Sequence, residues 1–180
     1  MGGPRKLHKK FEKPRHPWDS ANLERESAIR KKYGLKTKRE IWRSETVLRR
    51  FRRQARSLQP LKGPAAEKQK AELIRRLMSL NLVKEGASLD DVLSVSLDDV
   101  LNRRLDAIVY MKGLASTPKQ ARQFIKHGHI VIKNKAVTVP SYMVLAEEEG
   151  FIGHRKGSTV HEIVVARAPE EPGARGQKEG

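Results

Sequence analysis

The sequence contains no cysteine among its 180 residues. That absence excludes disulfide bonds, thiol catalysis and cysteine-ligated zinc, and it fits a reducing compartment. No apolar run approaches the roughly 20 residues that a bilayer-spanning helix needs. Residues 1–15 also lack the apolar centre of a signal peptide. We therefore expect a soluble, intracellular protein with no membrane partner.

Acidic residues are scarce relative to basic ones. The 38 Lys and Arg residues outnumber the 21 Asp and Glu residues, which gives a formal net charge of +17. Such an excess repels itself in a free protein but is compensated against phosphates, so a polyanionic partner is expected. Apolar residues make up only 37% of the chain, which predicts a small core with extended, solvated arms.

The first 18 residues combine Gly, Pro and many cations with only three apolar anchors, Leu7, Phe11 and Trp18. A segment of this composition buries too little apolar surface to order itself. We expect an arm that folds against a partner, and a disordered solubility tail is the alternative. The cations of this arm are candidate contacts to the polyanion: Arg5, Lys6, Lys9, Lys10 and Arg15.

Beyond the arm, the pattern of expected helices and strands predicts an α+β protein in three further segments. Residues 19–97 form a helical N-terminal domain and residues 98–168 form a small domain of helices and short strands. Residues 169–180, "EEPGARGQKEG" with its preceding proline, form a disordered tail.

Two helices are predicted at the start of the N-terminal domain. Asp19 or Ser20 caps a helix that runs to Tyr33, and Thr37 with Glu40 has the spacing of a capping box for a second helix that ends before Pro60. The second helix has an apolar stripe that must be buried, formed by Ile41, Leu48, Phe51, Ala55 and Leu58. The opposite side is basic and carries Lys38, Arg39, Arg49, Arg52, Arg53 and Arg56.

Trp42 lies within this basic sector. It could stack on a base or cover a gap between helices, and the structural role is the favoured one.

The stretches "SLDDVLS" (88–94) and "SLDDVLN" (96–102) form a short repeat. A serine followed by aspartates is typical of a helix N-terminus, where the carboxylates complement the helix dipole. A metal site is the weaker alternative, because no other ligand cluster lies nearby. From Asp98 we expect one helix that continues to Gly113.

The stretch "TPKQARQFIK" (117–126) predicts a helix with one apolar and one basic side. Thr117 is its N-cap, with Pro118 in the first turn and Gln120 at the capping-box position. The core side carries Ala121, Phe124 and Ile125, and the outward side carries Lys119, Arg122, Gln123 and Lys126.

Short strands follow this helix. Gly128 supplies a left-handed helix end, Ile130 and Ile132 lie on one side of a strand, and Asn134-Lys135 makes a tight turn into "AVTVP". Further strands from "SYMVL", "GFIG" and "TVHEIVVA" complete a small, mostly antiparallel sheet against which two helices pack.

The outward side of residues 117–126 is suited to phosphates. Lys119 and Lys126 each offer a compact ammonium charge, and the planar guanidinium of Arg122 can donate two parallel hydrogen bonds to one phosphate. Amide or ring donors come from Gln123, His127 and His129, and the strand turn adds Lys133, Asn134 and Lys135. A merely solvated face is the alternative, but no Glu lies four residues from these cations to pair with them.

Catalytic patterns are weak. No Ser/His/Asp triad is legible, no Gly-rich loop has the spacing of a nucleotide-binding motif, and His127 and His129 lack a third metal ligand nearby. We expect no enzyme activity, no cofactor and no metal.

The stretch "RRLDAIVYMKGLASTPKQARQFIKHGHIVI" followed by "VTVPSYMV" resembles the RNA-binding domain named after ribosomal protein S-four, over about residues 103–145. "PRHPW", "KYGLKTKREIWR" and "LRRFRRQARSL" resemble the N-terminal half of the archaeal and eukaryotic form of that family. Bacterial members often carry an N-terminal cysteine cluster for zinc, which is absent here.

The resemblance implies a structural protein of the cytoplasmic small ribosomal subunit. Its members bind small-subunit rRNA early in assembly of the body and contribute to translational accuracy. They lie near the path by which mRNA enters, beside ribosomal protein S-five, and no homo-oligomer is expected.

The family's RNA-facing positions correspond in the small domain to Arg103 or Arg104, Thr117, Lys119, Gln120, Arg122, Gln123, Lys126, His127, His129 and Lys135. In the N-terminal half they correspond to Lys36, Lys38, Arg39, Arg43, Arg49, Arg50, Arg53 and Arg56.

Two other functions remain open. One is an RNA-handle protein outside the ribosome, as in enzymes that carry the same small domain, but such an enzyme needs a catalytic domain of about 100 residues. The other is a duplex-DNA binder, because helix, Gly113-Leu114, helix imitates a helix-turn-helix.

Overall fold

The computed structural model describes residue 9 and residues 11–158 of the chain. Arg5, Lys6 and Lys10, the expected strand "TVHEIVVA" and the expected tail lie outside the described residues.

The described chain has eight helices and a three-stranded antiparallel sheet, which confirms the α+β class. The N-terminal helices are α1 (Ser20–Lys32), α2 (Lys38–Leu58), α3 (Pro64–Ser79), α4 (Leu89–Ser94) and α5 (Leu97–Asn102). The predicted small domain, residues 98–168, includes most of α5 and contains α6 (Leu105–Met111), α7 (Pro118–Lys126), β1 (Ile130–Ile132), β2 (Lys135–Ala136), α8 (Ala146–Glu149) and β3 (Ile152–His154).

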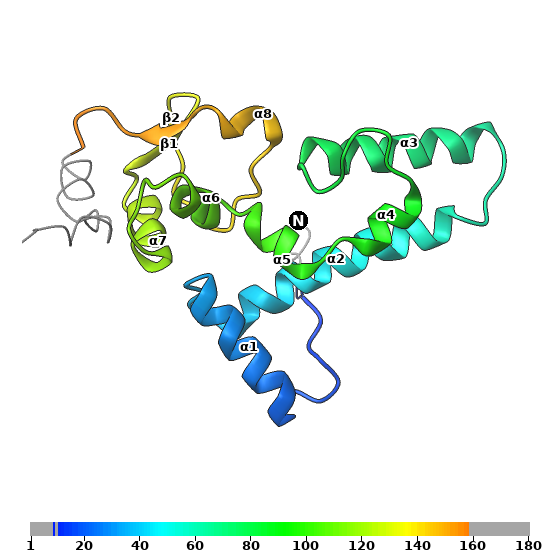
Figure 1. The fold of residues 1–180 in the computed structure, drawn as a ribbon, viewed down its shortest axis with the longest axis horizontal. Coiled ribbons are helices and arrows are strands. Elements are labelled where there is room, and N and C mark those ends of the chain that lie inside the picture. The colour runs from blue at the N-terminus through cyan, green and yellow to red at the C-terminus, as the bar shows by residue number, and fades with distance from the viewer. Residues whose placement is uncertain (1–8, 10, 159–180) are drawn as a thin grey trace, which may run out of the picture.

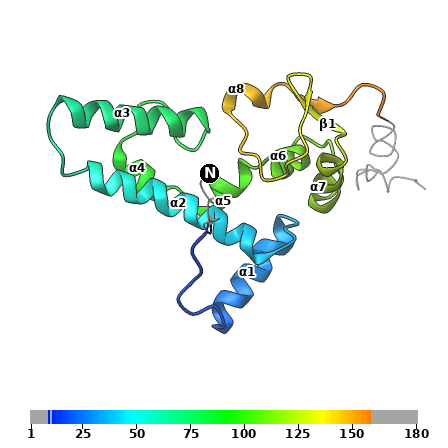
Figure 2. The same ribbon diagram turned by 180° about the vertical axis from the view of Figure 1, so that it is seen from behind.

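Helix α2 runs through the middle of the molecule, with α3 and α4 along its C-terminal part and α1 at its N-terminal end (Figure 1). The small domain lies to one side, and the reverse view shows α5 between α2 and α6 (Figure 2). Within the described residues, none of the helices is both long enough and apolar enough to cross a membrane.

The predicted apolar stripe of α2 is confirmed. Its five residues are all buried: Ile41, Leu48, Phe51, Ala55 and Leu58. They divide among three adjacent clusters, of which the largest packs the C-terminal half of α2 against Leu73 and Leu77 of α3. Because one helix supplies all three clusters, α2 fixes the relative positions of its neighbours.

The two Ser-Leu-Asp-Asp repeats cap α4 and α5, as expected. In each capping box the serine hydroxyl accepts from the third residue's N–H while that residue's carboxylate accepts from the serine N–H. Among the described residues no group of three or more His, Asp or Glu side chains is arranged to hold a metal ion.

The expected continuous helix from Asp98 to Gly113 is wrong, because the chain breaks between α5 and α6. Arg104 has an extended backbone (φ −76°, ψ 145°). The next amide, that of Leu105, donates to Tyr142 O at 2.8 Å, and Val144 N donates to Arg103 O at 3.0 Å. These long-range bonds hold "SYMVL" as an isolated bridge beside residue 104 and not as the strand that we expected.

The small domain packs α6 and α7 on the sheet. Ala121, Phe124 and Ile125 of α7 are buried, as predicted, in one cluster with β1 and β3. The strand order is β2-β1-β3, and "GFIG" supplies β3. Gly128 ends α7 with φ 75°, which a side chain would disfavour.

The hairpin turn lies one residue earlier than expected. Ile132 pairs with Lys135, so the turn residues are Lys133 and Asn134, with φ of 48° and 66°. Two successive positive φ values define a type I′ turn, which matches the twist of a two-residue hairpin. Lys133 occupies a position that disfavours most side chains, and it lies at the hairpin tip.

Candidate nucleic-acid interface

The basic side of α7 begins with a well-formed cap. Thr117 Oγ1 accepts from Gln120 N at 3.2 Å, and Gln120 Oε1 accepts from Ser116 N at 2.8 Å. Thr117 and Gln120 therefore hold the start of the helix. Lys119 and Lys126 are exposed and have no ion-pair partner within the described part of the chain.

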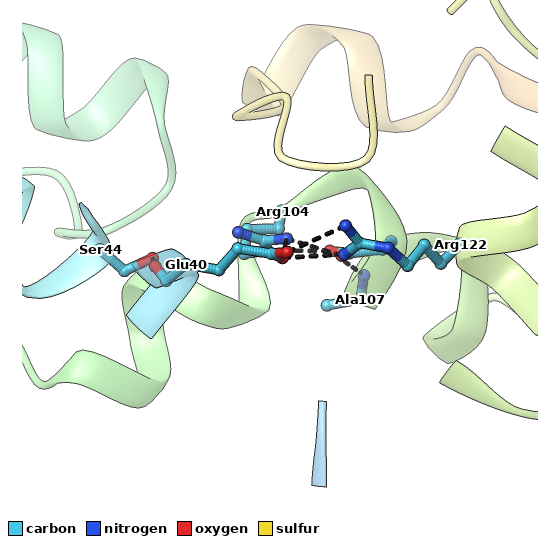
Figure 3. Close-up of polar contacts among 6 residues, drawn as sticks. Glu40, Ser44, Arg104, Ala107 and Arg122 are labelled. Carbon is cyan, nitrogen blue, oxygen red and sulfur yellow. Dashed lines mark hydrogen bonds and ion pairs between the residues drawn. The ribbon is translucent and has the colours of Figure 1, made fainter. Parts of the chain in front are cut away.

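Arg122 does not lie in this exposed row, and our expectation that it points outward is wrong. Its guanidinium forms a two-pronged ion pair with Glu40 of α2, with N–O distances of 2.8 and 2.9 Å. Figure 3 shows the two side chains meeting end to end across the boundary between α2 and α7. Glu40 is consequently not free to complete the capping box that we expected at Thr37, and that box is absent.

The same carboxylate also binds Arg104, which is 4% exposed. Arg104 donates to Glu40 Oε2 at 3.1 Å and to both carboxylate oxygens of Asp106, at 3.0 and 2.8 Å. Burial alone would lower the pKa of the Arg104 guanidinium, but the bonds and charges of Asp106 and Glu40 outweigh it and raise that pKa. Arg104 thus stays charged inside the protein.

Arg103 is buried as well. Its guanidinium pairs with Glu149 at 2.7 Å and donates to Val144 O at 3.1 Å. Because Arg103 and Arg104 are enclosed by carboxylates and carbonyls, neither offers a free guanidinium to a phosphate in this conformation. We therefore assign both to stabilisation of the fold.

The boundary between the two halves is tight beside this ion-pair cluster. Gly34, between α1 and α2, has φ 61°, and a Cβ there would lie 2.9 Å from Pro118 Cβ at the start of α7. The salt bridges and this close approach together fix α7 relative to α2. A pocket opens at the boundary, lined by Glu40, Arg43, Ser44, Val47, Val100, Arg104, Arg122, Pro140, Ser141 and Met143.

Several predicted cations of α2 are paired within the protein. Lys38 pairs with Glu26 at 3.2 Å, and Arg49 pairs with both Glu12 and Glu45. Others are held more loosely or by the backbone: Arg53 lies 3.9 Å from Glu12, and Arg52 donates to Val95 O at 2.6 Å.

A second group of cations is exposed and has no ion-pair partner in residues 9 and 11–158: Lys36, Arg39, Arg43, Arg50 and Arg56. At ~100° per residue, Arg39, Arg43 and Arg50 lie within about 40° of one another on α2. They form a line on the side away from the buried stripe, and we call these three residues the α2 row.

The remaining predicted residues surround the hairpin and the arm. Lys133 lies over the Phe151 ring at 5.7 Å, and Lys135 and His127 are exposed. His129 is half-buried: its ring contacts Phe124 edge-on, and its Nδ1 lies 3.0 Å from Ser158 Oγ. Gln123 of α7 and the arm residues Lys9 and Arg15 are exposed as well.

The two tryptophans have opposite environments. Trp42 donates to Glu26 Oε1 at 2.8 Å and lies 5.9 Å from the Phe11 ring, which confirms its structural role. Trp18, which we expected to anchor the arm, is 86% exposed. Of the expected apolar anchors within the described residues, Phe11 is the one that packs on the rest of the chain.

Similarity to known proteins covers nearly the whole chain. A family model described as the S4 domain matches residues 103–149. The small ribosomal subunit protein uS4 of Picrophilus torridus is 48% identical over 161 residues, covering 88% of each chain. That of Saccharolobus islandicus is 44% identical over 182 residues, covering 99% of each. The chain belongs to the uS4 family.

The helical spacing of the sequence predicted both basic helices but not the role of Glu40. Its spacing from Thr37 indicated a cap, and its true partners, Arg104 and Arg122, lie 64 and 82 residues away in the sequence. One signal was available: Glu40 is an acidic residue in a strongly basic helix start, "KREIWR", where it meets no cation four residues ahead.

Proposed function

We propose that this chain is a structural constituent of the small ribosomal subunit and that it binds small-subunit rRNA. The observation that carries the proposal is its membership of the uS4 family over 88% to 99% of its length. The α2 row and the α7 residues Lys119 and Lys126 support it, because these exposed cations have no ion-pair partner within the described chain.

The two basic surfaces act by phosphate neutralisation. Each Lys or Arg that meets a phosphate releases counterions, so the affinity depends on salt and little on base sequence. Lys119 and Lys126 lie two turns apart on α7, and the α2 row gives planar guanidinium groups that can grip a phosphate with two bonds. Lys133 and Lys135 extend the α7 surface along the hairpin. His127 and Gln123 add hydrogen-bond donors beside it.

The Glu40 cluster gives these surfaces a fixed relation to each other. Because Arg104 and Arg122 tie α6 and α7 to α2, the two surfaces approach the RNA already oriented. A preoriented surface loses less conformational entropy on binding. Arg122 therefore contributes to RNA binding through its position and not through a phosphate contact.

At a finer level, we propose that the chain helps to nucleate assembly of the body of the subunit. It lies near the path by which mRNA enters, next to ribosomal protein S-five, and contributes to translational accuracy in cytoplasmic ribosomes. The names of three relatives, each a small ribosomal subunit protein uS4, support a structural role over an enzymatic one.

Crosslinking within intact small subunits tests this proposal. A photoreactive side chain at Arg43 or Lys126 should crosslink to small-subunit rRNA, whereas one at Ala71, on the exposed part of α3, serves as the comparison site. Absence of the chain from purified subunits, or its presence without rRNA crosslinks from either basic position, would reject the proposal.

Competition binding separates RNA from duplex DNA as the partner. In a helix-turn-helix, α7 would enter the major groove and read bases with its side chains. Because Arg122 is paired with Glu40, its guanidinium is not free to contact a base. We expect structured rRNA to displace duplex DNA at equal salt, and equal affinity for both would favour the DNA-binding alternative.

A further inference from the structure

Trp18 is the most exposed of the large apolar side chains in the described chain, at 86%. A tryptophan that becomes buried removes about 150–250 Å² from water, which makes it a strong contributor to cores and interfaces. Trp18 obtains none of this stabilisation from its own chain, so its indole is available to a partner.

The segment that carries Trp18 is attached at both ends. On one side Phe11 packs on Trp42, and Glu12 N donates to Thr46 Oγ1 of α2 at 3.0 Å. On the other side Asp19 is the N-cap of α1. Pro14 and Pro17 restrict the backbone between these points. The indole is therefore presented on a held segment and not on a free end.

Its surroundings are polar and mostly basic. Trp18 lines a shallow hollow together with Arg15, His16, Pro17 and Asp19. Arg15 and His16 are exposed and have no salt-bridge partner within the described residues. The Asp19 carboxylate instead accepts from Asn22 Nδ2 at 3.0 Å. An aromatic face beside a free guanidinium has the two features that bind a nucleotide, a surface for the base and a charge for its phosphate.

We propose that Trp18 is a stacking platform for an unpaired nucleobase of the bound RNA, with Arg15 contacting the adjacent phosphate. This inference rests on the proposed rRNA binding and adds a base contact to its phosphate contacts. From the sequence, base stacking is the less favoured alternative for Trp42; the structure packs Trp42 against Phe11 and Glu26 and leaves Trp18 exposed. A hydrophobic pocket of a neighbouring protein is the less suitable partner, because the residues that share the hollow are charged or polar with one proline.

Equilibrium binding of the full-length chain to transcribed small-subunit rRNA of Picrophilus torridus tests the proposal. Base-aromatic stacking is worth about 1–3 kcal/mol. Trp18→Ala should therefore weaken binding roughly 5- to 150-fold, whereas Trp18→Phe, which keeps an aromatic face, should retain most of the affinity. Leu61→Ala, another exposed apolar residue at 48%, is the matched control and should bind like the wild type.

Fluorescence gives a second measurement, because the chain has only two tryptophans. Saturating rRNA should quench the emission of Trp18 and shield it from acrylamide, and this change should be absent in Trp18→Phe. Wild-type affinity in Trp18→Ala, equal losses in Trp18→Ala and Trp18→Phe, or unchanged acrylamide access in the complex would each overturn the stacking role. If the wild-type chain itself does not bind the rRNA, both the proposed function and the stacking role fail. That outcome differs from failure of the stacking role alone, in which the wild type binds and Trp18→Ala binds equally well.

Discussion

Replacing Glu40 by glutamine is the most informative single change in this chain. The amide has nearly the same shape as the carboxylate, so packing is preserved, but the negative charge between Arg104 and Arg122 is lost. Three charge-assisted hydrogen bonds are affected, at 2.8, 2.9 and 3.1 Å. Arg104 keeps Asp106 as a partner, whereas Arg122 is left 3.9 Å from that carboxylate.

The cost follows from these contacts. The amide oxygen can still accept, but the amide nitrogen is a donor and cannot accept from Arg122, so at least one of the three bonds is lost. A hydrogen bond to a charged group contributes about 1.5–3 kcal/mol and a neutral one about 0.5–1.5 kcal/mol, so each bond that remains weakens by about 1 kcal/mol. The side chain of Arg122 is 27% exposed, and water compensates it in part. Removing one partner of a fully buried pair costs about 3–5 kcal/mol, which sets the upper limit. We therefore expect E40Q to lower the free energy of unfolding by about 2–3 kcal/mol.

Denaturant and thermal unfolding measure this cost. In a chain of this size, about 2–3 kcal/mol corresponds to a fall in Tm of roughly 4–12 °C. Glu24→Gln is the control, because Glu24 is exposed on α1 and has no ion pair among the described residues; its effect should stay within about 0.5 kcal/mol. Equal stability of E40Q and the wild type would show that the Glu40 cluster does not hold the two halves together.

RNA affinity is a second measurement on E40Q. A role of Glu40 through its charge alone and a role in orienting α7 predict opposite changes in that affinity. Loss of one negative charge should strengthen binding to a polyanion if charge alone decides. If Glu40 fixes the relation of α7 to α2, E40Q should bind rRNA more weakly even below its Tm, while Glu24→Gln binds as tightly as the wild type or slightly more so. Stronger binding by E40Q would refute the orienting role.

Three further predictions concern other parts of the chain. Phe124→Ala should cost about 3–5 kcal/mol in denaturant unfolding, because the ring lies in the core of the small domain, and a loss below about 1 kcal/mol would contradict its burial. The double change Lys119→Ala with Lys126→Ala should reduce the slope of log affinity against log salt by roughly 1.4–1.8, and an unchanged slope would mean that both cations stay solvated. Burial, with a hydrogen bond to Asp98 at 2.9 Å, raises the pKa of Tyr33. The stabilisation from a raised pKa is complete below the unfolded pKa, about 10, and is lost as the pH rises toward the folded pKa. The advantage of wild type over Tyr33→Phe, about 1 kcal/mol, should therefore be constant below about pH 10 and shrink above it; an advantage that grows above pH 10 would be inconsistent with this pKa.

Local patterns in the sequence predicted the features that local physics controls. The apolar stripe of α2 could be found because burial of one helix face imposes a 3.6-residue period. The caps at Ser88 and Ser96 were visible because both partners lie within four residues. The end of α7 at Gly128 follows from the positive φ that glycine tolerates.

Features that depend on distant residues could not be found in this way. The break between α5 and α6 is set by backbone bonds from Leu105 to Tyr142 and from Val144 to Arg103, about 40 residues apart in the chain. The hairpin turn was misplaced by one residue because Asn134 was expected at its first position, and the register of Ile132 with Lys135 makes it the second.

The candidate interface shows the same division. Exposure of Lys119 and Lys126 follows from their helix face, and both are exposed as predicted. Whether Arg122 and Arg104 are paired or free depends on the carboxylate of Glu40 in α2. A contact between such distant residues leaves no periodic pattern in the sequence. The general excess of cations in the sequence identified a polyanion-binding chain, but only the fold separates the cations that stabilise the protein from those left for a partner.

The salt dependence of rRNA binding by a variant of the α2 row tests the central claim most directly. Arg39, Arg43 and Arg50 would all be changed to Gln, and affinity for transcribed small-subunit rRNA would be measured at several concentrations of KCl. We predict that the wild-type log affinity falls linearly with log salt and that the variant shows a slope smaller by roughly 2–3, with its Tm little changed. A wild-type affinity that does not depend on salt, or the same slope in the variant, would contradict a role for these exposed cations in binding the RNA backbone.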